Sequence, residues 1–169
     1  MEVRAVTLGI AMLVMPAMAG DVQRPTDLDT ASAFSALKSL AGEWQADTKQ
    51  GKAVMTYEVI AGGTTVLERE KAPGMPDMLT AYHLDGKRLL LTHYCMAGNQ
   101  PRMQAESWEP AKREIRFKFL DATNLKPGAG HMHNMTLRLL TDDRLASEWQ
   151  FYENGQPKMT ETFEYTRVR

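Results

Sequence analysis

Hydrophobic and polar residues alternate along most of the chain after residue 42. A period of two is typical of β-strands that bury one face. Turn residues, most clearly Asp85-Gly86 and Asn154-Gly155, separate the alternating segments as they would in hairpins. The pattern predicts ten strands, at residues 43–48, 53–60, 64–70, 78–84, 88–95, 102–109, 114–120, 131–140, 144–152 and 158–168.

A short helical pattern comes before the strands, at residues 31–40. Phe34 and Leu37 are spaced to share one apolar face, and Asp29 or Thr30 can cap the N-terminus. No helical pattern separates the strands, which excludes the crossovers of a parallel sheet. We therefore expect an all-β fold: a single antiparallel up-and-down β-barrel of about ten strands with a short N-terminal helix. A β-sandwich is the alternative.

The first 19 residues have the layout of a secretory signal peptide. Arg4 supplies a positive charge, an apolar run follows, and Ala17-Met18-Ala19 forms a small-x-small cleavage site. The apolar run is too short to span a bilayer. We expect a signal peptide at residues 1–19, a flexible leader at 20–30 and the barrel domain at 31–169, in an exported protein that is periplasmic or extracellular. A buried N-terminal helix is the alternative.

The composition of the chain disfavours nucleic acid and anionic membranes as partners. The chain has 169 residues and a formal net charge of −1, so it has no excess of positive charge for nucleic acid or an anionic membrane surface. Cys95 is the only cysteine and cannot form an intramolecular disulfide. Stability must therefore come from the hydrophobic core.

Several polar side chains continue the inward, apolar parity of their strands. Because buried polar groups need a partner, a bound water or a ligand, these positions are candidates for the lining of a site. They are His93, Cys95, Asp121, His131, His133 and Glu161. Trp108 falls on the polar parity, which predicts either an exposed ring or a shift of register by one residue.

Residues 40–44, Leu-Ala-Gly-Glu-Trp, place Gly-x-Trp at the start of the first strand. This resembles the opening of lipocalin-like (calycin) barrels, and the ten strands look more like their fatty-acid-binding and nitrobindin-like branches. The segments around Cys95 and His131 also resemble a group of exported bacterial proteins of unknown function. The resemblance implies that Arg167, with Arg169 as the alternative, stacks over Trp44 and closes the barrel floor. It also implies an apolar pocket.

We therefore expect this barrel to bind a small hydrophobic or amphipathic ligand that carries a polar or acidic head. The residues expected to contact the head are His93, Asn99, Arg102, Asp121, His131 and His133. The residues expected to contact the apolar body are Phe117, Phe119, Met135, Trp149 and Phe163.

Other functions stay open at this point. His93, Cys95, His131 and His133 form two pairs at strand spacing i, i+2, which suits zinc or copper, but hydrogen-bonded inner histidines are the simpler expectation. Nitrobindin-like barrels bind haem through a wall histidine, so the resemblance makes haem an alternative, with His83 included among the candidates. A lyase- or isomerase-like enzyme could use the same histidines as acid and base. A protein-interaction barrel whose lumen is filled by its own side chains is the last alternative. We assign no cofactor, metal or catalytic residue.

Overall fold

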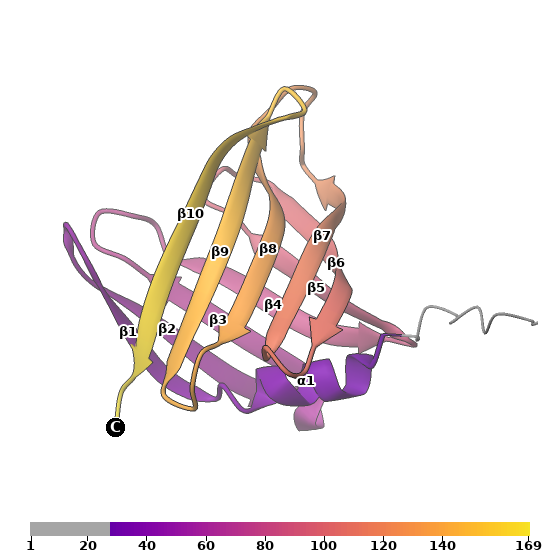
Figure 1. Ribbon diagram of the computed structural model, residues 1–169. Coiled ribbons are helices and arrows are strands. Elements are labelled where there is room, and N and C mark those ends of the chain that lie inside the picture. Colours follow the sequence, from indigo (N-terminus) through magenta and orange to yellow (C-terminus); the bar gives the residue numbers. More distant parts are fainter. Residues whose placement is uncertain (1–27) are drawn as a thin grey trace, which may run out of the picture.

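The structure, a computed structural model, describes residues 28–169, which form a closed antiparallel β-barrel (Figure 1). The strands follow one another around the barrel in the order β1-β10-β9-β8-β7-β6-β5-β4-β3-β2. The elements are α1 (Thr30–Lys38), β1 (Gly42–Thr48), β2 (Gly51–Ile60), the 3₁₀ turn η1 (Ala61–Gly63), β3 (Thr65–Lys71), β4 (Met78–Asp85), β5 (Arg88–Tyr94), β6 (Gln100–Glu109), β7 (Glu114–Thr123), β8 (His131–Leu139), β9 (Arg144–Glu153) and β10 (Gln156–Arg167).

The predicted all-β barrel with a short helix is confirmed, and closure excludes the sandwich. Each predicted strand overlaps one observed strand. Asp29 caps α1, where its carboxylate accepts a hydrogen bond from the backbone N–H of Ser32 at 3.0 Å. The expected signal peptide and the leader up to residue 27 lie outside the described residues. Within residues 28–169, no helix has the length and apolar character needed to cross a bilayer.

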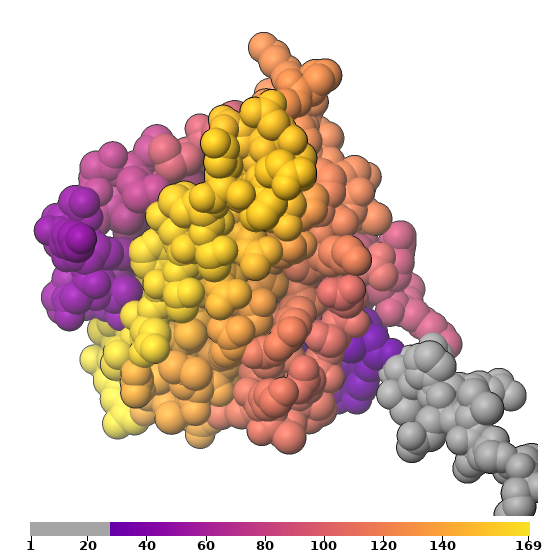
Figure 2. Space-filling model, turned by 45° about the horizontal axis from the view of Figure 1, so that its top comes forward, coloured from indigo at the N-terminus to yellow at the C-terminus, as the bar shows by residue number. Residues whose placement is uncertain are grey.

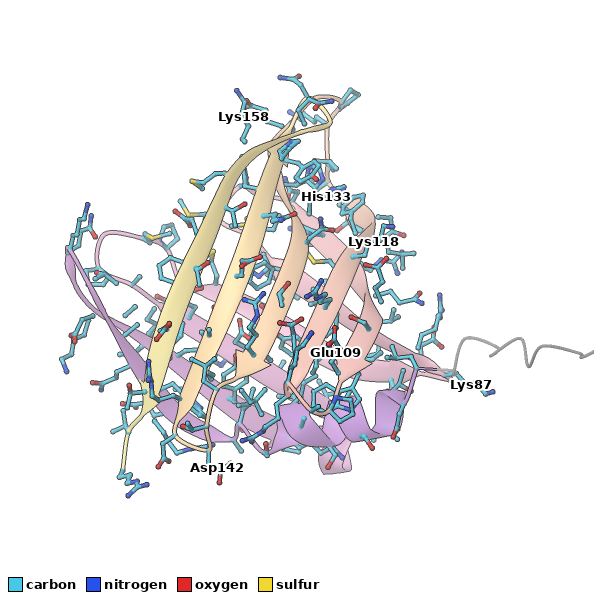
Figure 3. All side chains as sticks on the ribbon, viewed as in Figure 1. Lys87, Glu109, Lys118, His133, Asp142 and Lys158 are labelled. Carbon is cyan, nitrogen blue, oxygen red and sulfur yellow. The ribbon has the colours of Figure 1, made fainter. Side chains whose placement is uncertain are left out.

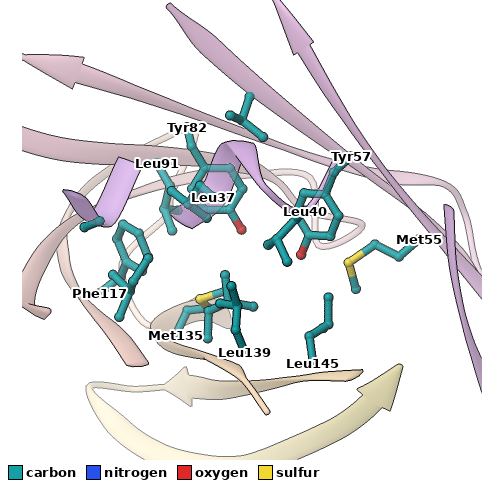
Figure 4. Close-up of a cluster of buried hydrophobic side chains, with 14 of the residues drawn as sticks. Leu37, Leu40, Met55, Tyr57, Tyr82, Leu91, Phe117, Met135, Leu139 and Leu145 are labelled. Atoms are coloured by element: carbon teal, nitrogen blue, oxygen red, sulfur yellow. The ribbon is translucent and has the colours of Figure 1, made fainter. Parts of the chain in front are cut away.

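The helix α1 covers the lower end of the barrel in Figure 1, and its apolar side chains belong to the hydrophobic core. Phe34 and Leu37 on the helix, and Leu40 just after it, are buried. In the close-up of Figure 4, Leu37 and Leu40 face Met135 and other side chains of the opposite wall. The lower half of the lumen is therefore a packed core, and any cavity has to lie toward the other end.

An arginine–tryptophan contact ties the two chain ends together at this floor, as the resemblance implied. The guanidinium of Arg167 lies 4.1 Å from the ring centroid of the fully buried Trp44. The same guanidinium donates to the carbonyl oxygens of Ala41 at 2.8 Å and Ser39 at 2.9 Å. The indole N–H of Trp44 donates to the carbonyl of Leu40 at 2.8 Å. Arg167 therefore joins β10, β1 and the segment that follows α1.

A register shift corrects the predicted orientation of Asp121. Arg102 pairs with Asp121 and Met103 with Phe119, so Leu120 has no partner and the alternation reverses there. Asp121 consequently leaves the inward face, and its side chain is 48% exposed. The prediction that Asp121 points inward is wrong.

Two further register shifts change which side chains point into the barrel. On β8, Met132 pairs with Phe151 and Asn134 with Gln150, so His133 is the extra residue of a bulge. On β6, a shift between Ala105 and Ser107 brings Trp108 opposite the buried Ile115. Trp108 packs partly buried against the core, which settles the open question of its parity in favour of a register shift.

We expect Arg167→Ala to lower the free energy of unfolding by about 2–3 kcal/mol, since it removes a cation–π contact and charged hydrogen bonds. Urea denaturation measures this change. Arg144→Ala is the matched control, because Arg144 pairs with Glu164 where both side chains are more than half exposed. That pair should contribute less than about 1 kcal/mol. Equal losses in the two variants would contradict the role given to Arg167.

Candidate functional site

The barrel opens where its first and last strands part. β1 and β10 pair only at Trp44 with Arg167 and at Gln45 with Thr166. Beyond these two pairs the β1–β2 hairpin leans away from β10, as Figures 1 and 2 show. A cavity of about 620 Å³ lies at this end of the lumen. Its lining comprises Thr48, Gln50, Ala53, Glu70, Ala72, Pro73, Gly74, Met75, Met78, His93, Cys95, Met96, Ala97, Met132, Trp149, Phe151, Met159, Glu161 and Phe163.

His93, on β5, is the most deeply buried polar residue of this lining. Its side chain is 3% exposed, and its ring centroid lies 4.7 Å from that of Trp149. The Nδ1 atom is 3.0 Å from the hydroxyl oxygen of Thr80. The Nε2 atom is buried and has no hydrogen-bond partner among the described residues. An orphaned polar atom of this kind costs free energy unless something from outside the fold pairs with it.

Thr80 connects His93 to a buried carboxyl group. The Thr80 hydroxyl donates to Glu68 at 3.2 Å, and the Tyr82 hydroxyl donates to the other carboxyl oxygen at 2.6 Å. A hydroxyl that donates to Glu68 can only accept from the imidazole. With Glu68 ionised and accepting this hydrogen bond, His93 carries its proton on Nδ1, which leaves the Nε2 lone pair free to accept a hydrogen bond.

Burial shifts the pKa of both His93 and Glu68, which Thr80 connects. It lowers the pKa of His93 to about 4, so the ring is neutral at physiological pH. It also raises the pKa of Glu68 to about 7, although the hydrogen bonds from Tyr82 and Thr80 partly oppose the shift. Tyr57 and Tyr82, both buried, have their pKa raised by burial and by the Glu68 carboxyl.

Two further carboxyl groups lie nearer the mouth. Glu70 accepts a hydrogen bond from the Tyr165 hydroxyl at 3.1 Å, and burial raises its pKa. Glu161 faces the same cavity from β10, and its charge raises the pKa of Glu70 further. None of the described residues that line the cavity is Lys or Arg. The charge inside the cavity is therefore negative or zero.

Of the six predicted head-group residues, His93 alone lines this cavity. Asn99 is buried under the β7–β8 loop, and its side-chain amide donates to the carbonyl of Gly130 at 2.9 Å. Arg102 and Asp121 form a bidentate ion pair in which each side chain is about half exposed. The two groups thus neutralise each other at the surface, away from the lining.

His131 and His133 form a separate cluster at the β7–β8 edge, and Figure 3 shows His133 beside the upper part of β8. The Nε2 of His131 is 3.0 Å from the Nδ1 of His133. The His133 ring stacks between Phe119 at 4.6 Å and Tyr152 at 4.0 Å. Within residues 28–169, no group of three or more His, Cys, Asp or Glu side chains could hold a metal ion. The four-residue metal site considered above is therefore not formed.

The residues predicted to contact the apolar body of the ligand lie in three different regions of the barrel. Trp149 and Phe163 line the cavity, Phe117 and Met135 belong to the closed core, and Phe119 packs on the histidine cluster.

Glu68 and Glu70 were not among the residues that the sequence predicted for the site. Both follow the inward parity of the buried Val66 on β3, so strict alternation would have found them.

Comparisons with known proteins support the fold. No family model and no curated protein matches this chain. Among solved structures, it is similar to the crystal structure of Rv2717c from M. tuberculosis, with a TM-score of 0.55 and 15% sequence identity. The alignment covers 81% of this chain and 98% of that chain. At this identity the likeness shows a common barrel fold, consistent with the calycin-like resemblance.

We expect Glu68→Gln to become more stable relative to the wild type as the pH rises from about 4.5 to 7. The pKa of Glu68 is raised on folding, so the wild-type residue favours the folded state in acid and loses that contribution as pH increases. The difference in free energy of unfolding should change by about 3 kcal/mol over this range. Urea denaturation at several pH values measures it.

His93 acts in the opposite direction, because its lowered pKa destabilises the folded state in acid. This contribution is present in both proteins and cancels in the difference. Glu164→Gln serves as the control, since Glu164 is exposed and paired with Arg144. If Glu68→Gln showed the same pH dependence as the wild type, Glu68 would not have the raised pKa that its burial implies.

Proposed function

We propose that the protein is an exported β-barrel that binds a small, mostly apolar molecule in the cavity at its mouth. The observation that carries the proposal is the cavity itself, where apolar side chains surround the unpaired Nε2 of His93. Pockets for small molecules commonly combine an apolar lining with a few fixed polar groups. His93 is fixed in this way, held by Thr80 on one side and by Trp149 on the other.

The chemistry of the lining favours binding over catalysis. A general base works best when its pKa is near the working pH, whereas that of His93 is about 4. Cys95 is buried, and burial raises the pKa of its thiol, which leaves little of the nucleophilic thiolate at neutral pH. The lyase- or isomerase-like reading is therefore the weaker of the two.

We expect Ala72→Trp to weaken binding of the neutral apolar dye Nile red about tenfold or more, because the indole would occupy the cavity. Ala72 lines the cavity just after β3. A fluorescence titration of the purified protein measures the dissociation constant. Ala111→Trp is the matched control, since Ala111 is exposed in the β6–β7 turn at the opposite end of the barrel. Equal binding by both variants, or no saturable binding by the wild type, would overturn the proposal.

We also expect the full-length precursor to be cut after Ala19 when it is expressed in a bacterium, so that the mature chain begins at Gly20. The reason is the small-x-small site at Ala17-Met18-Ala19. Cell fractionation and N-terminal sequencing test this, with Ala17→Arg and Ala19→Arg together as the uncleaved control. An uncut chain in the cytoplasm would contradict the exported location. Native mass spectrometry of the same material would reveal a co-purifying haem or metal ion, which are the alternatives to an organic ligand.

A further inference from the structure

The charged groups of the cavity are of one sign. Glu70 and Glu161 reach it from β3 and β10, and no described lining residue is Lys or Arg. His93 cannot serve as their cation, because it is neutral. Thr48 and Gln50, which also line the cavity, are uncharged. Whatever fills the cavity therefore meets two carboxyl groups with no positive charge from the protein among them.

The two carboxyl groups face the lumen because of the strand register. Glu70 pairs with Met55 on β2 and Met78 on β4, both buried, so it lies on their inward face. Glu161 pairs with the buried Trp149 of β9. The positions are thus set by the barrel wall, not by flexible loops.

The third group is the Nε2 of His93, which is nine-tenths or more buried and has no partner among the described residues. Its lone pair needs a hydrogen-bond donor. Trp149 links it to Glu161, since the Trp149 ring contacts His93 and the Trp149 backbone pairs with Glu161. One wall of the cavity therefore carries an acceptor and a carboxylate together.

We propose that the ligand is an apolar molecule with a protonated amine head, which donates an N–H to His93 and places its positive charge between Glu70 and Glu161. The inference rests on the proposed function of the cavity and specifies its ligand class. An ammonium group supplies the positive charge that the lining lacks, and its N–H groups can donate to the unpaired Nε2 of His93. Three aromatic rings, those of Trp149, Phe151 and Phe163, would contact the apolar body or the edge of the cation.

The same groups disfavour a fatty acid or another anion. A carboxylate head would be desolvated beside two carboxyl groups without a basic partner, and it has no donor for Nε2. This reverses the acidic head allowed in the sequence-based expectation. Burial and Glu161 already raise the pKa of Glu70, and a cation between the two carboxyl groups would relieve their repulsion.

The test uses three probes with the same ten-carbon chain: decylamine, decanol and decanoate. Isothermal titration calorimetry with the mature protein near pH 7.5 should show decylamine binding about tenfold or more tightly than decanol, and decanoate most weakly. Glu161→Gln and Glu70→Gln should each reduce the ratio of decylamine affinity to decanol affinity. Glu164→Gln is the matched control, because it removes a carboxylate from the outer face of the same strand as Glu161.

The outcomes separate the two proposals. If decanol or decanoate bound as tightly as decylamine, the amine head would be excluded and the proposed binding function would stand. The same holds if the two lining Glu→Gln variants kept the full preference. If no probe bound, and Nile red did not bind either, the binding function itself would fail. His93→Leu gives a further check, since it should weaken decylamine more than decyltrimethylammonium, which has no N–H to donate.

Discussion

Closure of the barrel depends on a short junction between the chain's first and last strands. β1 and β10 share only two register pairs, and at one of them the Arg167 guanidinium covers the Trp44 ring. Arg167 also donates to two backbone carbonyl groups that follow α1. Carbonyl groups at the C-terminus of a helix have no hydrogen-bond partner within the helix. Because this junction lies at the floor, the helix and the strands are fixed there. At the other end of the barrel, β1 and β10 are not paired and separate to form the mouth of the cavity.

Burying the polar groups above the barrel floor costs free energy of folding, and the packing of the core does not require these groups. Glu68 is almost fully buried, and it meets hydroxyl groups where an ion pair would be expected. Its raised pKa is the measure of that cost. Through Thr80, this carboxyl group is connected to the Nδ1 atom of His93. The network therefore holds in place one atom that faces the cavity, the Nε2 of His93, in the way that outer hydrogen bonds orient functional groups elsewhere.

The fold could be predicted because each local pattern agrees with the barrel. Period-two alternation, turn dipeptides and the Asp29 cap all indicate the elements that are observed. The site was harder to predict, because a single extra residue reverses every later side chain on a strand. The bulge at His133 brings Met132 to the cavity, and the shift near Leu120 turns Asp121 outward. No residue type at these positions signals a bulge. His93 lies on the regular strand β5, and its predicted orientation is confirmed.

The electrostatics of the cavity follow from burial more than from the count of charges. Carboxyl groups near a histidine usually raise its pKa, yet desolvation dominates at His93 and keeps the ring neutral. The protein therefore cannot neutralise Glu70 and Glu161 from within its own lining. Removing water from the cavity makes this imbalance larger, since the interaction between charges strengthens as the dielectric falls. A neutral or anionic occupant would leave the two carboxyl groups less solvated and without a positive partner, whereas a cation would offset the loss of water with direct attraction. The charge proposed for the ligand thus follows from which strands carry the acidic residues of the cavity and from how deeply His93 is buried.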